Sequence, residues 1–464
     1  MCSRKLFTII AFIAAVACMH AQQYPFIRYS ANKLHYDTNA APMQFLFQKW
    51  QRVTSSGQGH LNIMHIGGSH VQAGTFPHSI RTNILRTYPN SVGSRGMVFP
   101  YSAAAKCNNP SDYKVHCPEK VVLTRNVYHS PEHPLGLCGI SVTAQNQPTH
   151  IQMILSDKEF DYNTTRIIVL GHSSQGVTPL ISYDSRRITP SYIDSVNHRF
   201  IFNLHRAVDS FEVVLPCKEG QSFTLTGVYL GSRQSGISYS SIGVNGAAVP
   251  DYFKCSLTRD LKLVSPDLVI FGIGINDAHG QNFDTVAFKR NYIRLCDSIR
   301  SINPYCAFIF ITNNDCYRKT GRKGYSVNTN GLLVREVCYR LANLTGGAVW
   351  DQFEIMGGLK SMAEWQKNKL AQADKVHFTC AGYQLMGDLF FEALNQELQK
   401  DWCAHKMKKG TGNTVQKTSI KSDLKERPLP RGLRRKPTAK PNPQVNKSSN
   451  QQINNSDRFP YIPD

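Results

Sequence analysis

The strongest constraint on the fold of this 464-residue chain is a set of four short apolar runs with the composition of buried strands. Segments of helical periodicity lie between them, at 285–302 and 331–344, and a last helix is expected over 380–398. Asp284 and Thr379 stand where they can cap two of these helices. Buried strands that alternate with crossover helices are typical of a parallel sheet, so we expect an α/β fold. The four runs are Leu61–Ile66, Leu268–Phe271, Phe308–Ile311 and Ala348–Trp350.

A different pattern occupies residues 140–235, where short strand-like runs follow one another with turn residues between them. Strands at regular intervals without helices are typical of an antiparallel sandwich. We therefore expect a β-sandwich inserted between two parts of an α/β domain, 57–139 and 236–403. The runs are Ile151–Leu155, Arg166–Leu170, Leu180–Tyr183, Arg199–Leu204, Phe211–Leu215 and Phe223–Leu230.

The N-terminus has the pattern of a secretory signal peptide, expected over residues 1–21. Arg4 and Lys5 precede an apolar stretch that is too short to span a bilayer. A loosely lipobox-like sequence ends at Cys18, so lipid anchoring at that cysteine is an alternative to release. No later stretch has transmembrane length. The mature protein is expected in the periplasm, at the cell surface or in the medium.

The chain has 53 Lys and Arg against 32 Asp and Glu, and much of the excess falls in residues 404–464. This tail is also rich in Pro, Asn, Ser and Gln, a composition that cannot bury enough apolar surface to become ordered. We predict a disordered basic tail, which is either simply solvated or contacts anionic polymers at the cell surface. Nucleic acid is not an expected partner of an exported chain.

The 13 cysteines include no Cys-x-x-Cys pair, so a zinc knuckle is not expected. Export permits disulfides, and Cys107 and Cys117 are close enough in sequence to be candidates for one. The pairing of the others stays open.

A serine at the end of the first strand is the candidate nucleophile. Ser69 follows Gly67 and Gly68, and the carboxyl end of a strand in an open α/β sheet is where ligands bind. A hydroxyl nucleophile needs a base and an acceptor that orients the base, and His377 and Asp374 supply both at a spacing of three residues.

Two further residues are candidate oxyanion donors. Asn276 follows the second strand with a side-chain amide, and Gly246 can bring its backbone N–H close because it lacks a side chain. This chemistry needs no metal or organic cofactor.

Four segments together resemble the four blocks of the SGNH (GDSL-type) hydrolases over about 60–135 and 236–400. The resemblance implies a flavodoxin-like three-layer core and ester hydrolysis through an acyl-enzyme. It also implies an oxyanion hole of the Ser69 and Gly246 backbone N–H groups and the Asn276 side chain. The segments are Gly67–His70, Gly243–Gly246, Gly274–Asp277 and Asp374–His377.

The β-rich insertion resembles that of bacterial peptidoglycan O-acetylesterases, whose first block also has His after Ser. The substrate expected from this resemblance is an O-acetyl group, or another acyl ester, on a cell-wall or other extracellular glycan. The sandwich would help to hold the polymer.

One position departs from the family pattern. The family usually has Asp between Gly and Ser, where this chain has Gly68. Loss of that carboxylate could loosen the turn that positions Ser69. A glycan-binding protein with impaired catalysis is therefore one alternative, and a lipase or aryl esterase with the same machinery is another.

Three features imitate other sites. Ser173, in Gly171–Gly176, resembles a nucleophile elbow whose second glycine comes one residue too late, and it lies in the predicted sandwich. His129–His133 has the spacing of an inverted zincin motif, but Pro131 would interrupt the required helix, so a loop is expected. His65 and His70 flank Ser69 and are predicted to have structural or substrate-contact roles.

Overall fold

A computed structural model describes residues 24–104, 109–157, 159–322 and 324–410, with side chains up to residue 400. The predicted signal peptide, the candidate anchor Cys18, Cys107 and the tail from residue 411 lie outside these ranges. None of the helices in the described part of the chain is long and apolar enough to cross a membrane.

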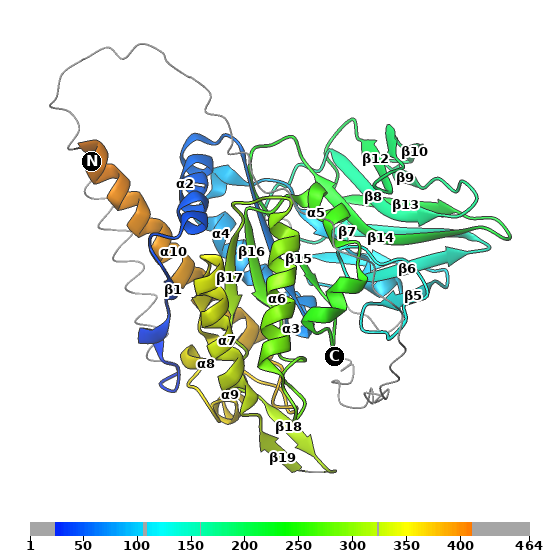
Figure 1. Cartoon of the computed structure of the whole chain (residues 1–464). Coiled ribbons are helices and arrows are strands. Elements are labelled where there is room, and N and C mark those ends of the chain that lie inside the picture. The colour runs from blue at the N-terminus through cyan, green and yellow to red at the C-terminus, as the bar shows by residue number, and fades with distance from the viewer. Residues whose placement is uncertain (1–23, 105–108, 158, 323, 411–464) are drawn as a thin grey trace, which may run out of the picture.

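A six-stranded sheet forms the centre of the molecule, in the order β1-β20-β17-β16-β2-β15 (Figure 1). Five of its strands run parallel, and β1 pairs antiparallel with β20 at the edge. If the five parallel strands are numbered 1 to 5 along the chain, they lie side by side in the order 2-1-3-4-5. This is the flavodoxin-like order, so the predicted fold class is confirmed. The strands are β1 (Leu34–Tyr36), β2 (His60–Gly67), β15 (Gly236–Gly243), β16 (Leu268–Gly272), β17 (Ala307–Ile311) and β20 (Ala348–Trp350).

Helices cover both faces of this sheet, because neighbouring strand residues point to opposite sides. One face is covered by α2 (Ala41–Ser56), α4 (Thr75–Thr87) and α10 (Cys380–Gly410), and the other by α5 (Leu257–Val264), α6 (Thr285–Arg300) and α7 (Asn330–Thr345). Ile63 of β2 packs into the core on the face covered by α2, α4 and α10. Its neighbour Met64 packs into the core on the other face, covered by α5, α6 and α7.

The three predicted helices and both predicted caps are present. Asp284 accepts hydrogen bonds from the Val286 and Ala287 N–H groups, and the Thr379 hydroxyl accepts one from Gly382 N–H at 3.3 Å. The last helix, α10, extends beyond the predicted end at 398 to Gly410.

Two antiparallel sheets, β10-β9-β13-β7-β4 and β11-β12-β8-β14-β6-β5, make up the β-rich part, with β3 paired to β14. Their inner side chains share one hydrophobic core, as predicted for a sandwich. The sheets start before residue 140, because β4 pairs with β7 and β5 pairs with β6. The strands are β3 (Gly96–Val98), β4 (Tyr113–His116), β5 (Val122–Arg125), β6 (Ile140–Gln145), β7 (Pro148–Leu155), β8 (Arg166–Ser173), β9 (Leu180–Tyr183), β10 (Arg186–Ile188), β11 (Tyr192–Asp194), β12 (Arg199–Asn203), β13 (Ser210–Pro216) and β14 (Ser222–Gly231).

Short elements complete the chain, and one of them is a hairpin that extends away from the body (Figure 1). The hairpin strands are β18 (Tyr317–Thr320) and β19 (Gly324–Val327), and the short α-helices are α3 (Ser69–Gln72), α8 (Gln352–Ile355) and α9 (Met362–Lys367). The 3-10 turns are η1 (Tyr29–Ala31), η2 (Pro89–Ser91), η3 (Tyr101–Ala103) and η4 (Val249–Lys254).

Candidate active site

Ser69 stands on a tight turn between β2 and α3. A side chain at Gly67 would place its Cβ 2.1 Å from Val71 Cγ2, so only glycine fits where the strand turns into the helix. The Gly67 carbonyl accepts a hydrogen bond from the Tyr252 hydroxyl at 2.7 Å. The Gly68 carbonyl accepts the first hydrogen bonds of α3, from Val71 and Gln72. These contacts hold the turn without any carboxylate at position 68.

The structure brings Ser69, His377 and Asp374 together although 308 residues separate the first two. Ser69 Oγ lies 2.8 Å from His377 Nε2, and His377 Nδ1 lies 2.6 Å from Asp374 Oδ2. An ionised carboxylate can only accept, so the Nδ1 atom of His377 carries the hydrogen and Nε2 is left to accept from the serine hydroxyl. The geometry is that of a nucleophile, a base and an orienting acid.

Asp374 is itself fixed by its own loop. Its Oδ1 atom accepts hydrogen bonds from the Val376 and His377 backbone N–H groups at 2.9 and 3.0 Å. Burial alone would raise the pKa of Asp374, but hydrogen bonds from the His377 side chain and from these N–H groups lower that pKa below its usual value. The carboxylate therefore stays ionised at neutral pH, as an acceptor for His377 must.

The two candidate oxyanion donors come from neighbouring strand ends. Gly243 of β15 and Gly272 of β16 both pair with Gly67, so the loops that follow them leave the sheet beside Ser69. Gly246 has φ +82°, a conformation that favours glycine. Asn276 Nδ2 donates to the Ala247 carbonyl at 3.0 Å, which ties its loop to that of Gly246.

The absent side chain at position 68 matters for Asn276. A Cβ on Gly68 would lie 3.2 Å from Asn276 Nδ2 and 3.5 Å from the Ala247 carbonyl oxygen. The asparagine amide thus lies against the backbone of residue 68, next to the nucleophile. A side chain at this position would require the Asn276 amide to move by a few tenths of an ångström.

The two histidines that flank Ser69 have different surroundings. His70 Nδ1 lies 2.8 Å from the Tyr383 hydroxyl, and the His70 ring lies 5.1 Å from the ring of His377. Burial, followed by the nearby His377, lowers the pKa of His70 to about 3, so His70 is neutral where an esterase works. His65 is fully buried, with Nδ1 2.9 Å from the Tyr239 hydroxyl.

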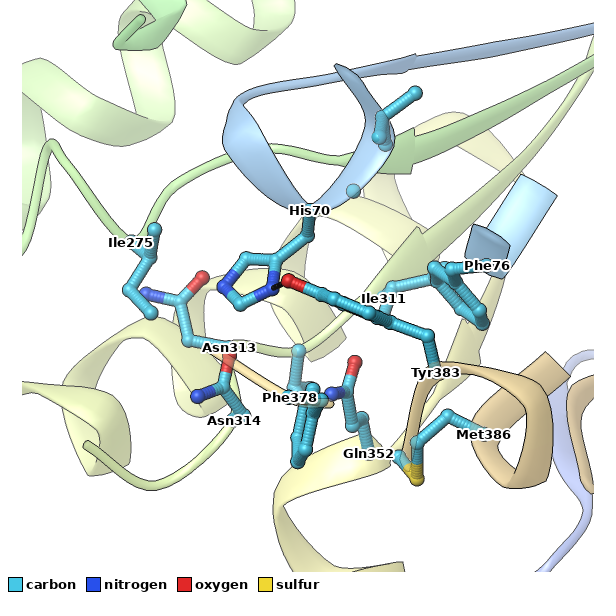
Figure 2. A pocket seen from close by; sticks show the side chains of 13 residues that line it. His70, Phe76, Ile275, Ile311, Asn313, Asn314, Gln352, Phe378, Tyr383 and Met386 are labelled. Atoms are coloured by element: carbon cyan, nitrogen blue, oxygen red, sulfur yellow. Dashed lines mark hydrogen bonds between the residues drawn. The ribbon is translucent and has the colours of Figure 1, made fainter. Parts of the chain in front are cut away.

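A pocket of about 30 Å³ lies beside His70 (Figure 2). The His70 ring stands between Tyr383 and Asn313, and Gln352 closes the lower side. Neither Ser69 nor His377 lines this pocket, and its volume suits about two water molecules. The pocket therefore lies beside the candidate nucleophile and base and is not lined by them.

The imitating motifs lie apart from this site. Ser173 ends β8 in the sandwich, and its hydroxyl donates to the neighbouring Ser174 carbonyl. Residues 129–133 form bends between β5 and β6 without a helix, as predicted. Among the described residues, no group of three or more His, Cys, Asp or Glu side chains is arranged to hold a metal ion.

Three supporting side chains escaped the sequence analysis. Gln72 Oε1 accepts from the Asn245 N–H at 2.7 Å, and Arg125 of β5 donates to the Asn245 carbonyl, so both hold the loop that carries Gly246. Tyr252 anchors Gly67. None of the three side chains belongs to a recognisable sequence motif. Their contacts depend on how the elements that carry them are placed in the fold.

Comparison with known proteins gives one family match. Residues 225–385 match the model of the GDSL-like lipase/acylhydrolase family, which confirms the resemblance seen in the sequence. Among curated proteins, none matches the chain.

Solved structures also match the chain. One, described as "Peptidoglycan O-acetylesterase in action, 5 min", shares 19% identity with a TM-score of 0.65, and the match covers 79% of this chain and 99% of that chain. A lipase/acylhydrolase from Enterococcus faecalis shares 23% identity over 35% of this chain and 77% of that chain, with a TM-score of 0.27. A family two carbohydrate esterase from Cellvibrio japonicus shares 10% identity over 62% and 99%, with a TM-score of 0.26. The first likeness shows a common fold over nearly the whole of the other chain.

Proposed function

From the premise that this chain is an SGNH-type carboxylic ester hydrolase with a GDSL-like lipase/acylhydrolase domain, we propose that it removes O-acetyl groups from an extracellular glycan. The observation that carries the proposal is the chain of contacts Ser69–His377–Asp374, at 2.8 and 2.6 Å, at the carboxyl end of the sheet. We further propose that the chain acts outside the cytoplasm, in line with its signal-like N-terminus.

In the proposed mechanism, Ser69 Oγ attacks the ester carbonyl carbon while its proton passes to His377 Nε2. Asp374 stabilises the resulting imidazolium, and the Ser69 N–H, the Gly246 N–H and the Asn276 amide stabilise the oxyanion. His377 then gives the proton to the sugar oxygen, which leaves as an alcohol. Water attacks the acetyl-Ser69 ester by the same route in reverse, releasing acetate and restoring the serine.

The substrate class rests on the shared fold and on the inserted sandwich. The chain shares its fold with a solved peptidoglycan O-acetylesterase over 99% of that protein. The described sandwich also lies in the same chain as the ester-hydrolase domain. We therefore favour an acetylated glycan over a lipid or a small aryl ester.

The test measures acetate release by the purified chain from O-acetylated peptidoglycan, with p-nitrophenyl acetate and a long-chain ester alongside. Ser69→Ala is expected to lower kcat by about 10⁴-fold or more, because it removes the nucleophile. Ser173→Ala is the matched control and should keep full activity. Glycan binding without Ser69-dependent acetate release would favour the impaired binding protein, and hydrolysis of long-chain esters alone would favour a lipase.

A further inference from the structure

The hairpin β18–β19 rests on both loops that carry the proposed site. The Tyr317 N–H donates to the Lys375 carbonyl at 3.1 Å, within the loop of Asp374 and His377. Arg318 donates to the His279 carbonyl, three residues after Asn276. The base of the hairpin is therefore tied to the catalytic base on one side and to an oxyanion donor on the other.

The exposed part of this hairpin carries positive charge without a counter-charge. Its described residues, 317–322 and 324–327, include Arg318, Lys319 and Arg322 and no Asp or Glu. Lys319 and Arg322 are exposed, and neither forms an ion pair with any residue that the structure describes. Unpaired cations on a projecting ribbon are available to an anionic partner.

Two tyrosines add aromatic surface to the same hairpin, Tyr317 at its base and Tyr325 opposite Lys319. Lys375 Nζ lies 4.9 Å from the ring centre of Tyr317 and 5.4 Å from that of Tyr325, so its ammonium group is held by cation–π contacts. Tyr325 is 39% exposed. A partly exposed ring beside a held ammonium group can pack on the apolar face of a sugar while the cation meets an acidic group.

We propose that the hairpin β18–β19 is a binding arm for a glycan strand that bears carboxylates, which it guides across the site of Ser69. The proposal rests on the proposed esterase function and adds a substrate feature to it. The aromatic surface and the lack of acidic residues fit an acidic polysaccharide, whose charges and ring faces alternate along one chain.

The test compares two acetylated polymers, polygalacturonate and a neutral cello-oligosaccharide, with the full chain and with Lys319→Ser/Arg322→Ser. The ratio of kcat/KM on the acidic polymer to that on the neutral one should fall by about fivefold to tenfold, mostly through KM. The wild-type preference should also weaken as salt is raised. Arg52→Ser/Lys262→Ser removes two exposed cations from α2 and α5, outside the sandwich and the site loops, and should leave the ratio unchanged.

An unchanged ratio, whether both activities fall equally or neither falls, would overturn the proposal. If Ser69-dependent acetate release is absent altogether, the esterase proposal fails, and the arm is then tested by binding of unacetylated polygalacturonate. In that assay a tighter complex with wild type than with Lys319→Ser/Arg322→Ser supports the arm, and equal affinities refute it.

Discussion

At the scale of single residues, the backbone of position 68 lies against the Asn276 amide, next to the candidate nucleophile Ser69. The Cβ of Gly68→Ala would lie 3.2 Å from Asn276 Nδ2, so the amide must shift by a few tenths of an ångström. Because removal of one oxyanion donor costs about 10²–10³-fold, we expect its displacement to lower kcat about tenfold. Hydrolysis of p-nitrophenyl acetate measures this.

The control for that variant is Gly280→Ala, in the same loop as Asn276, where an added Cβ meets nothing within 4 Å. Gly68→Asp, which restores the usual family residue, should be at least as impaired as Gly68→Ala. Higher activity of Gly68→Asp than of the natural chain would mean instead that the missing carboxylate weakens the turn.

Asp374→Asn should lower kcat about 10⁴-fold, because an amide N–H in place of the carboxylate no longer fixes the His377 tautomer. The pKa of Asp374 lies below its usual value, so the carboxylate is ionised throughout the neutral range. Ionisation of Asp374 should therefore add no step of its own to the pH profile of the natural chain between about pH 5 and 9. A pH profile of kcat/KM checks this, with Asp297→Asn, exposed on α6, as the control.

How far single residues could be predicted depends on where their partners lie. Asp374 and His377 share one loop, so their spacing in the sequence indicated their contact. Arg125 contacts Asn245 from a strand 120 residues earlier in the chain. No sequence motif near either residue predicts this contact. The roles of the predicted site residues remain predictions until the variants are measured.

At the scale of elements, a buried strand can be predicted from the sequence when its residues are apolar, and not when they are polar. β16 and β17 are continuous apolar runs and were predicted. β15 was missed because it contains Ser238 and Ser240, which are buried and yet polar. Their hydroxyls accept from the Ser94 and Met97 N–H groups of the neighbouring chain segment, so only the fold explains why a strand with serines is buried.

The contact between β5 and the loop of Gly246 leads to a prediction about how the sandwich supports the site. Arg125→Ala removes the donor to the Asn245 carbonyl, so the Gly246 N–H should lose its fixed position. We expect kcat on p-nitrophenyl acetate to fall about tenfold while KM changes little. Arg125→Lys should recover part of the loss, and Arg186→Ala, on exposed β10, should have no effect. A loss confined to glycan substrates would place Arg125 in polymer binding instead.

At the scale of the whole molecule, one hydrophobic core joins the sandwich to a face of the central sheet. Phe223 and Val213 of the sandwich belong to the same buried cluster as Phe271 of β16 and Tyr292 of α6. The alternation of apolar residues predicted each sheet separately, but it carries no information on which faces meet. That is why the α/β and β-rich parts were predictable and their packing was not.

Burial of His65 should make the stability of the whole molecule depend on pH. Burial lowers the pKa of His65 to about 3 in the folded state, whereas the unfolded chain binds the proton near pH 6.5. Between these values the unfolded state carries more protons, so the free energy of unfolding falls as the pH falls. The contribution of this one group approaches about 1.4 kcal/mol per pH unit and disappears above about pH 7.

Urea unfolding at pH 4.5, 5.5, 6.5 and 7.5 tests this dependence. His65→Gln should be less stable at pH 7.5, because it disturbs a buried contact with Tyr239, but its free energy of unfolding should change less between pH 6.5 and 4.5. His129→Gln, exposed between β5 and β6, should keep the slope of the natural chain. Equal slopes for His65→Gln and the natural chain would mean that His65 is protonated in the folded state, which would require a charge to be accommodated in a fully buried site.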